Sequence, residues 1–153
     1  IMVYVPNDAV VKVVQSTHRG GDLQIKDFAG ELDVSMHYHK VRLSNAYGPL
    51  AINTIYGSVE ATFSDIPTED LRLHSTYGNV DISLPKSTAA NLRLSTSYGS
   101  MYTDFDINVG ANMKDGQHQD DDHDGGLTGT INGGGKLIAL NATYKNIYLR
   151  MVK

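Results

Sequence analysis

A short repeat constrains this chain more than any other feature. The dipeptide Tyr-Gly occurs four times, and its glycines are spaced 9, 21 and 21 residues apart. Aligned on this glycine, eight-residue blocks share apolar residues at positions one and three and tyrosine at position seven. The blocks are VRLSNAYG (41–48), LAINTIYG (50–57), LRLHSTYG (71–78), LRLSTSYG (92–99), a copy IALNATYK (138–145) that has Lys145 in place of glycine, and a degenerate early copy LQIKDFAG (23–30). Self-similarity at such a period is the signature of a stacked repeat architecture.

Alternation within and after the blocks predicts short strands. Leu50 and Ile52 follow Gly48, and Val80 and Ile82 follow Gly78, with a polar or small residue between the members of each pair. This period of two is typical of a strand with one buried face. No segment has a convincing helical period, so we expect an all-β chain of about a dozen strands.

The repeat length favours a β-solenoid. Repeats of about 18–21 residues hold two strands each and cannot bury their apolar face alone, so we expect successive repeats to stack as coils. A β-sandwich is the main alternative, although it does not require the same residues to recur at each turn. The glycine is expected at a tight corner that needs positive φ. The length of 153 residues predicts one domain, 1–153, with an acidic Gly/Asp-rich insertion at 114–127.

Charge and composition exclude several classes of protein. The net charge is −4, from 13 basic and 17 acidic residues, and without 114–126 the balance is 12 against 12. An electrically neutral body is a poor footprint for nucleic acid. The chain has no cysteine, which excludes a disulfide framework and thiolate catalysis. It also has no apolar run of about 18 residues, so we expect no transmembrane segment.

Three stretches together resemble a known family. The opening VYVPNDAVVKVVQSTHRGGDLQI (3–25), the Tyr-Gly blocks and the ending GTINGGGKLIALNATYKNIYL (129–149) resemble the bacterial putative-adhesin family, whose relatives include an auto-transporter adhesin head domain named for a Gly-Ile-Asn motif. The resemblance implies a right-handed parallel β-helix, exported to the cell envelope or surface, with any signal or lipid anchor outside this chain. It supplies no catalytic residues.

Two sets of side chains are candidates for ligand binding. A tyrosine ladder would offer aromatic rings about 4.8 Å apart to sugars or a protein, although tyrosines that pack on neighbouring rungs are the simpler interpretation. Its members are Tyr47, Tyr56, Tyr77, Tyr98 and Tyr144. Arginines at position two of their blocks, Arg42, Arg72 and Arg93, should point outward. They would bind acidic groups, or interleave with the outward acids Asp33, Glu60 and Asp81 and keep the sheet soluble.

The acidic insertion is the main candidate metal site. Asp120, Asp122, Asp124 and Gly125 match the opening of a calcium loop, but Ile131 stands where the bidentate glutamate belongs. We therefore expect no cofactor, and calcium at Asp120, Asp122 and Asp124 remains the alternative to a solvated loop.

These observations favour a non-catalytic module. We expect no enzyme, because Asp104 and Asp106 are the only alternating acid pair in an expected strand and no nucleophilic triad pattern is present. The predicted function is a surface or envelope module, an adhesin that presents a repetitive β face to a glycan or protein partner. A small β-helix carbohydrate-active enzyme and a purely structural envelope spacer are the alternatives.

Overall fold

Short strands make up the fold, as the alternation predicts. The computed structural model describes residues 5–6, 9–15, 21–108 and 126–152, in which there are 13 strands and no helix. Their bounds are β1 Val10–Gln15, β2 Leu23–Phe28, β3 Glu31–Met36, β4 Val41–Ala46, β5 Leu50–Thr54, β6 Val59–Thr62, β7 Leu71–Ser75, β8 Val80–Pro85, β9 Ala90–Ser95, β10 Met101–Thr103, β11 Leu127–Ile131, β12 Lys136–Ala142 and β13 Ile147–Val152.

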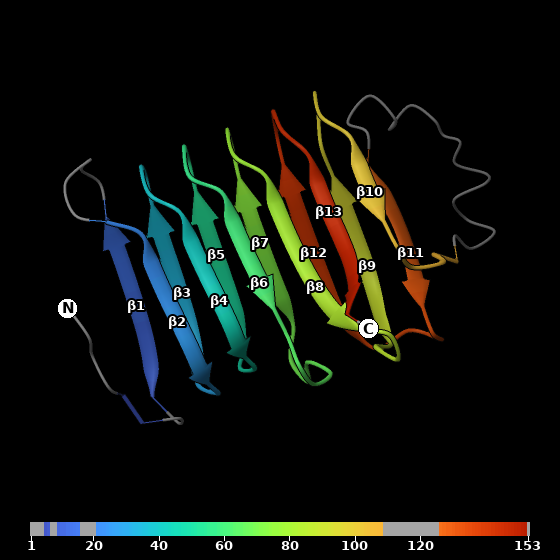
Figure 1. The fold of residues 1–153 in the computed structure, drawn as a ribbon, viewed down its shortest axis with the longest axis horizontal. Coiled ribbons are helices and arrows are strands. Elements are labelled where there is room, and N and C mark those ends of the chain that lie inside the picture. Colours follow the sequence, from blue (N-terminus) through green and yellow to red (C-terminus); the bar gives the residue numbers. More distant parts are fainter. Residues whose placement is uncertain (1–4, 7–8, 16–20, 109–125, 153) are drawn as a thin grey trace.

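The strands form two sheets that wind as a solenoid (Figure 1). Sheet A has the order β1-β3-β5-β7-β12-β9-β11 and sheet B the order β10-β13-β8-β6-β4-β2. Each coil contributes one strand to each sheet, and every strand pair is parallel except β11 with β9. Leu32 pairs with Leu50 and Leu50 with Leu71, which gives coil lengths of 18 (50 − 32) and 21 (71 − 50) residues. The prediction of an all-β solenoid is confirmed, and the β-sandwich alternative is wrong.

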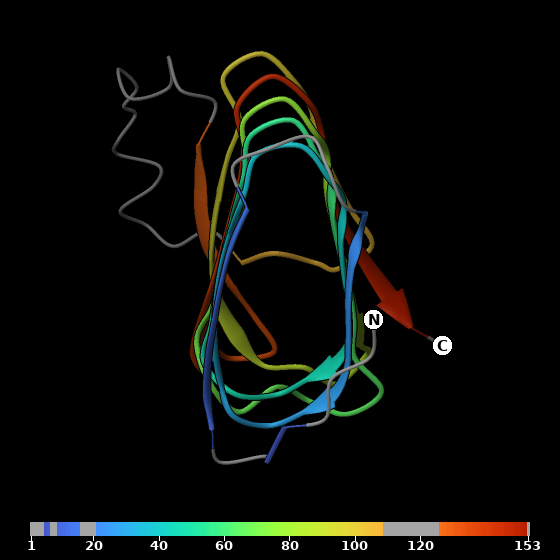
Figure 2. The ribbon, with the colours of Figure 1, turned by 90° about the vertical axis from the view of Figure 1, so that its left-hand side faces the viewer.

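The apolar members of each strand fill the space between the two sheets. Viewed along the stack, the sheets lie close together at one corner and further apart at the other (Figure 2). Leu71 and Leu73 in sheet A and Val80 and Ile82 in sheet B are all buried, whereas Arg72 between the two leucines is exposed. Burying such a side chain stabilises the fold by about 1.5–3 kcal/mol, so the stacked aliphatic rows hold the coils together.

The order of the coils differs from the order of the chain. The last coil, β12 and β13, does not stack on the end of the solenoid. β12 lies between β7 and β9, and β13 lies between β8 and β10, and Figure 1 shows both red strands inside the row of yellow and green ones. The expectation that successive repeats stack in sequence is therefore wrong for this coil.

One end of the stack is closed by a crossing segment. After β10 the chain passes from sheet B toward sheet A across the interior, as Figure 2 shows in yellow-orange. Phe105 in this segment is only 6 % exposed, and Ile107 packs against the core. Asn108 then bridges to Thr130 of β11. The inward apolar residues of β9 and β10, the coil at this end of the stack, are thereby shielded from water.

The glycines of the Tyr-Gly corners are required by close contact with the backbone of an adjacent coil. A Cβ added to Gly48 would lie 1.9 Å from the carbonyl oxygen of Gly30, and one added to Gly99 would lie 1.9 Å from that of Lys145. Among the described glycines, positive φ occurs at Gly133 and Gly134 and not at these corners. The expected reason for the glycine is thus wrong, because the neighbouring backbone, and not the backbone dihedral, excludes a side chain.

Buried hydroxyl groups support the same corners from inside. Ser75, three residues before Gly78, donates to the carbonyl oxygen of Gly57 (2.7 Å) and accepts the Gly78 N–H (2.9 Å). Thr54 and Thr96 hold the equivalent place and are likewise buried. A buried hydroxyl without a partner would cost free energy, so the hydrogen bonds account for polar residues at an inward position.

Candidate binding surfaces

A ladder of stacked tyrosines follows the narrow corner of the solenoid. The rings of Tyr38, Tyr56, Tyr77, Tyr144 and Tyr98 stack in that order, with centroid separations of 5.4, 5.1, 4.9 and 4.9 Å and interplanar angles of 16° or less. The order reproduces the position of the inserted last coil, because Tyr144 lies between Tyr77 and Tyr98. Each ring packs on its neighbours as the simpler interpretation predicts.

Tyr47 does not belong to this ladder. Its block lies on β4 in sheet B, so Tyr47 falls at the wide corner, where its ring packs near Phe63 (5.8 Å). Its hydroxyl donates to Asn45 Oδ1 (2.8 Å) and accepts the Asp65 N–H (3.1 Å). The inclusion of Tyr47 in the ladder is wrong, because two blocks only 9 residues apart cannot both be on the same sheet of a coil of 18 residues or more.

Tyr38 belongs to the ladder, although the alignment on Tyr-Gly did not include it. LDVSMHYH (32–39) precedes LAINTIYG by 18 residues (50 − 32) and carries Tyr38 at position seven, with His39 in place of glycine. This spacing from the next block was the sequence signal that could have identified Tyr38.

Because each inner ring of the ladder is covered on both faces, the ladder presents mainly ring edges and hydroxyls. Tyr98, at its end and 74 % exposed, has one ring face that no described aromatic ring contacts.

The three predicted arginines point outward, but only Arg72 and Arg93 lie on the same sheet. Arg72 on β7 and Arg93 on β9 belong to sheet A, and both are paired in register with Ala139 of β12. The other neighbour of Arg72 is Ala51. Two arginines two strands apart are roughly 10 Å apart at the backbone, and neither forms an ion pair with a described residue.

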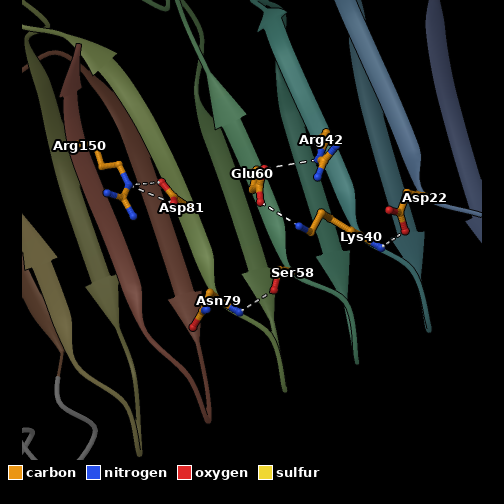
Figure 3. Close-up of polar contacts among 8 residues, drawn as sticks. All are labelled: Asp22, Lys40, Arg42, Ser58, Glu60, Asn79, Asp81 and Arg150. Carbon is orange, nitrogen blue, oxygen red and sulfur yellow. Dashed lines mark hydrogen bonds and ion pairs between the residues drawn. The ribbon is translucent and has the colours of Figure 1, made fainter. Parts of the chain in front are cut away.

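Arg42 occupies a different environment on the outward face of sheet B (Figure 3). Its Nε lies 3.5 Å from Glu60, and the Nζ of Lys40 lies 3.0 Å from the same carboxylate. Glu60 pairs in register with Asp81 of the next strand. This face therefore follows the interleaved-charge interpretation. Asp33 lies on sheet A, in register with Lys12 on one side and Ala51 on the other.

Arg150 and Asp81 form the closest ion pair on this face. Arg150 Nε lies 2.9 and 3.1 Å from the two carboxylate oxygens of Asp81 (Figure 3). This hydrogen bond, with the charge of Asp81, raises the pKa of Arg150 above its usual value. Both side chains are accessible to solvent, so the pair contributes little to stability.

Side chains that follow the corner join the backbones of adjacent coils. Ser58 Oγ accepts the Asn79 N–H (3.1 Å, Figure 3), Asn79 Oδ1 accepts the Asn146 N–H (2.9 Å), and Asn146 Oδ1 accepts the Ser100 N–H (2.9 Å). This chain of hydrogen bonds passes through the inserted coil. It fixes the axial position of that coil relative to its two neighbours.

His74 on the outward face of sheet A is half-buried by the inserted coil. Its register partners are Asn53 and Asn141. Burial lowers the pKa of His74, because a charged imidazolium loses hydration there, and a hydrogen bond with Asn141 opposes the shift. The protonation of His74 is therefore coupled to the packing of the last coil against β7.

The predicted metal site lies outside the described part of the chain. Asp120, Asp122 and Asp124 fall in 109–125, and the calcium interpretation stays a prediction. Within the described ranges, no group of three or more His, Asp or Glu side chains is arranged to hold a metal ion. The same residues include no helix long and apolar enough to cross a membrane.

Comparisons with known proteins identify a family. No curated protein and no solved structure matches the chain. A family model with the description Toastrack DUF4097 matches residues 3–148, and it names no activity. Since the match covers nearly the whole solenoid, from before β1 into β13, this chain belongs to the Toastrack DUF4097 family.

Proposed function

We propose that this chain is a non-catalytic module of the bacterial cell envelope or surface that presents the outer face of sheet A to a glycan or protein partner, in the manner of an adhesin. The resemblance of its opening and closing segments to adhesin domains motivates this assignment, including the export that it implies. A regular solenoid supplies a flat, repetitive surface on which ligand groups are repeated at the coil spacing.

The two arginines of sheet A carry the proposal. Arg72 and Arg93 flank Ala139 in one outward row and lack ion pairs with described residues. The alanine leaves both guanidinium groups accessible from the same side. Guanidinium groups bind carboxylates, sulfates and phosphates in a bidentate manner, so a partner with acidic groups fits this face best.

A binding screen with matched variants tests the proposal. Purified protein is screened against glycans and extracellular-matrix proteins, with and without millimolar calcium. We expect at least one reproducible partner, whose binding falls about tenfold or more in Arg72→Gln/Arg93→Gln and weakens with added salt. Arg42→Gln removes an arginine of the opposite sheet and should leave binding unchanged.

Two outcomes would contradict the proposal. If no partner binds in either condition, the adhesin-like role is wrong. If Arg42→Gln weakens binding as much as the double variant, sheet A is not the binding face. Binding that requires calcium would implicate the loop with Asp120, Asp122 and Asp124.

The stacked tyrosines favour the second candidate, a structural spacer. Their ring faces stack on one another along the corner, with centroid separations of 4.9–5.4 Å. Stacking of this kind stiffens a solenoid without requiring a ligand. A spacer role predicts that no partner is found and that the loss of a ladder tyrosine changes stability alone.

A further inference from the structure

A hollow at the edge of sheet B has features that the proposed function does not use. It has a volume of about 470 Å³ and opens onto the outward face of β10 and β13. Its lining includes Tyr102 and Tyr148, which pair in register, together with Asp104 and Arg150. Small-molecule sites combine such apolar surface with a few convergent polar groups. Both tyrosines lie three residues after the eighth position of a block, Gly99 or Lys145, so the repeat relates them, although the sequence analysis predicted no ligand there.

One ring face in the hollow, on Tyr102, is stacked on no described aromatic ring. Tyr102 stacks on Tyr148 with centroids 5.3 Å apart and an interplanar angle of 12°. The guanidinium carbon of Arg150 lies 4.9 Å from the centroid of the Tyr148 ring. Tyr148 is therefore engaged by two neighbours. Tyr102 is 53 % exposed, and no described strand lies beyond β10 in sheet B.

The polar side of the hollow keeps unused hydrogen-bonding capacity. Asp104 Oδ2 accepts the Met151 N–H (3.1 Å), while its Oδ1 bonds no described residue. Arg150 uses Nε for Asp81 (Figure 3), and its two terminal amino groups likewise bond no described residue. A carboxylate oxygen accepts hydrogen bonds and guanidinium groups donate them. A ligand rich in hydroxyl groups satisfies both.

We propose that this hollow binds a neutral sugar residue of a glycan, with Tyr102 packing against its C–H groups and Asp104 accepting hydrogen bonds from its hydroxyls. The sum of charges selects a neutral sugar over an acidic one. Arg150 is compensated by Asp81, and Asp104 adds a further negative charge, so the three groups sum to −1. This site lies on the opposite sheet from Arg72 and Arg93 and is independent of them.

The experiment compares glycan binding by the wild type and by two variants of the hollow. The purified 153-residue chain is titrated with neutral and uronic-acid oligosaccharides while the amide signals of β10 and β13 are followed by NMR. We expect a neutral oligosaccharide to shift these signals. Tyr102→Ala and Asp104→Asn should each weaken binding at least about tenfold. Tyr77→Ala, at an exposed tyrosine of the ladder, is the control and should bind as the wild type does.

The outcomes separate this site from the proposed function. Shifts that persist in both variants, or that arise only with uronic-acid oligosaccharides, overturn the inference. The absence of any shift with neutral oligosaccharides also overturns it, even if Arg72 and Arg93 bind a partner on sheet A. Asp104→Asn preserves the shape of the side chain, so a loss of binding at unchanged melting temperature supports a direct contact with the sugar.

Discussion

The first and last coils are built from the same alternating pattern, yet they differ in burial. In the last coil the inward residues Ile138, Leu140, Ala142, Ile147 and Leu149 are at most 2 % exposed. In the first coil the inward residues Val11, Val13, Leu23 and Ile25 are only partly buried. The last coil has a neighbour on both sides, whereas β1 and β2 each have one. Burial in this solenoid therefore depends on the place of a coil in the stack and not on its place in the chain.

The largest effect is expected from truncating a leucine of the inserted coil. Leu140→Ala should lower the free energy of unfolding by about 3 kcal/mol, because it leaves a cavity between two neighbouring coils. Leu23→Ala, the same change in the first coil, should cost about 1 kcal/mol, since its side chain is already partly hydrated. Urea denaturation of both variants measures the difference, and equal losses would contradict the comparison.

The corner glycines should show the same contrast. Gly99→Ala places a Cβ against the Lys145 carbonyl of the inserted coil, and we expect it to cost about 2–3 kcal/mol. A Cβ added to Gly21 in the first coil would meet no atom within 4 Å, so Gly21→Ala should be neutral within about 0.5 kcal/mol. Thermal unfolding of the two variants distinguishes them. A mild effect of Gly99→Ala would show that the corner relaxes.

The smallest effect concerns pH, through His74 and its partner Asn141 in the inserted coil. Because burial lowers the pKa of His74 below 6.5, the unfolded chain takes up a proton before the folded chain does. The contribution of this group is fully present above the unfolded pKa and is lost as the pH falls through 6.5 toward the folded pKa. Melting temperatures between about pH 7.5 and pH 5.5 should therefore fall more in the wild type than in His74→Gln. An identical fall in both would place the pH dependence elsewhere.

The sequence was sufficient for the strands and for their inward faces. The period-two pattern of 71–75 and 80–84 translates directly into buried Leu71, Leu73, Val80 and Ile82. The outward direction of Arg42, Arg72 and Arg93 followed from the same alternation. Such patterns are local, because each side chain alternates with its neighbour whatever the strand pairs with.

The binding surfaces were less predictable, since they depend on which strands are adjacent. Arg72 and Arg93 form one row only because β12, with Ala139, lies between their strands. Tyr102 and Tyr148 hold the same place in their repeats, three residues after Gly99 and Lys145, but they become neighbours only because β13 lies beside β10. Aligning the blocks on their glycines treated the two corners of each coil as one. This alignment therefore placed Tyr47 in the tyrosine ladder, although Tyr47 lies at the other corner.

The sequence by itself determined that this chain is an all-β stack of coils with aliphatic rows inside. Only the tertiary structure decided the order of those coils. Each strand has two edges at which another strand can pair. Because the inward aliphatic rows are nearly identical, the coils fit one another equally well in any order. The antiparallel strand β11 occupies the outer edge of β9, so β12 pairs with the inner edge and fills the place between β7 and β9. Competition for strand edges is a property of the whole fold, and no local pattern encodes it.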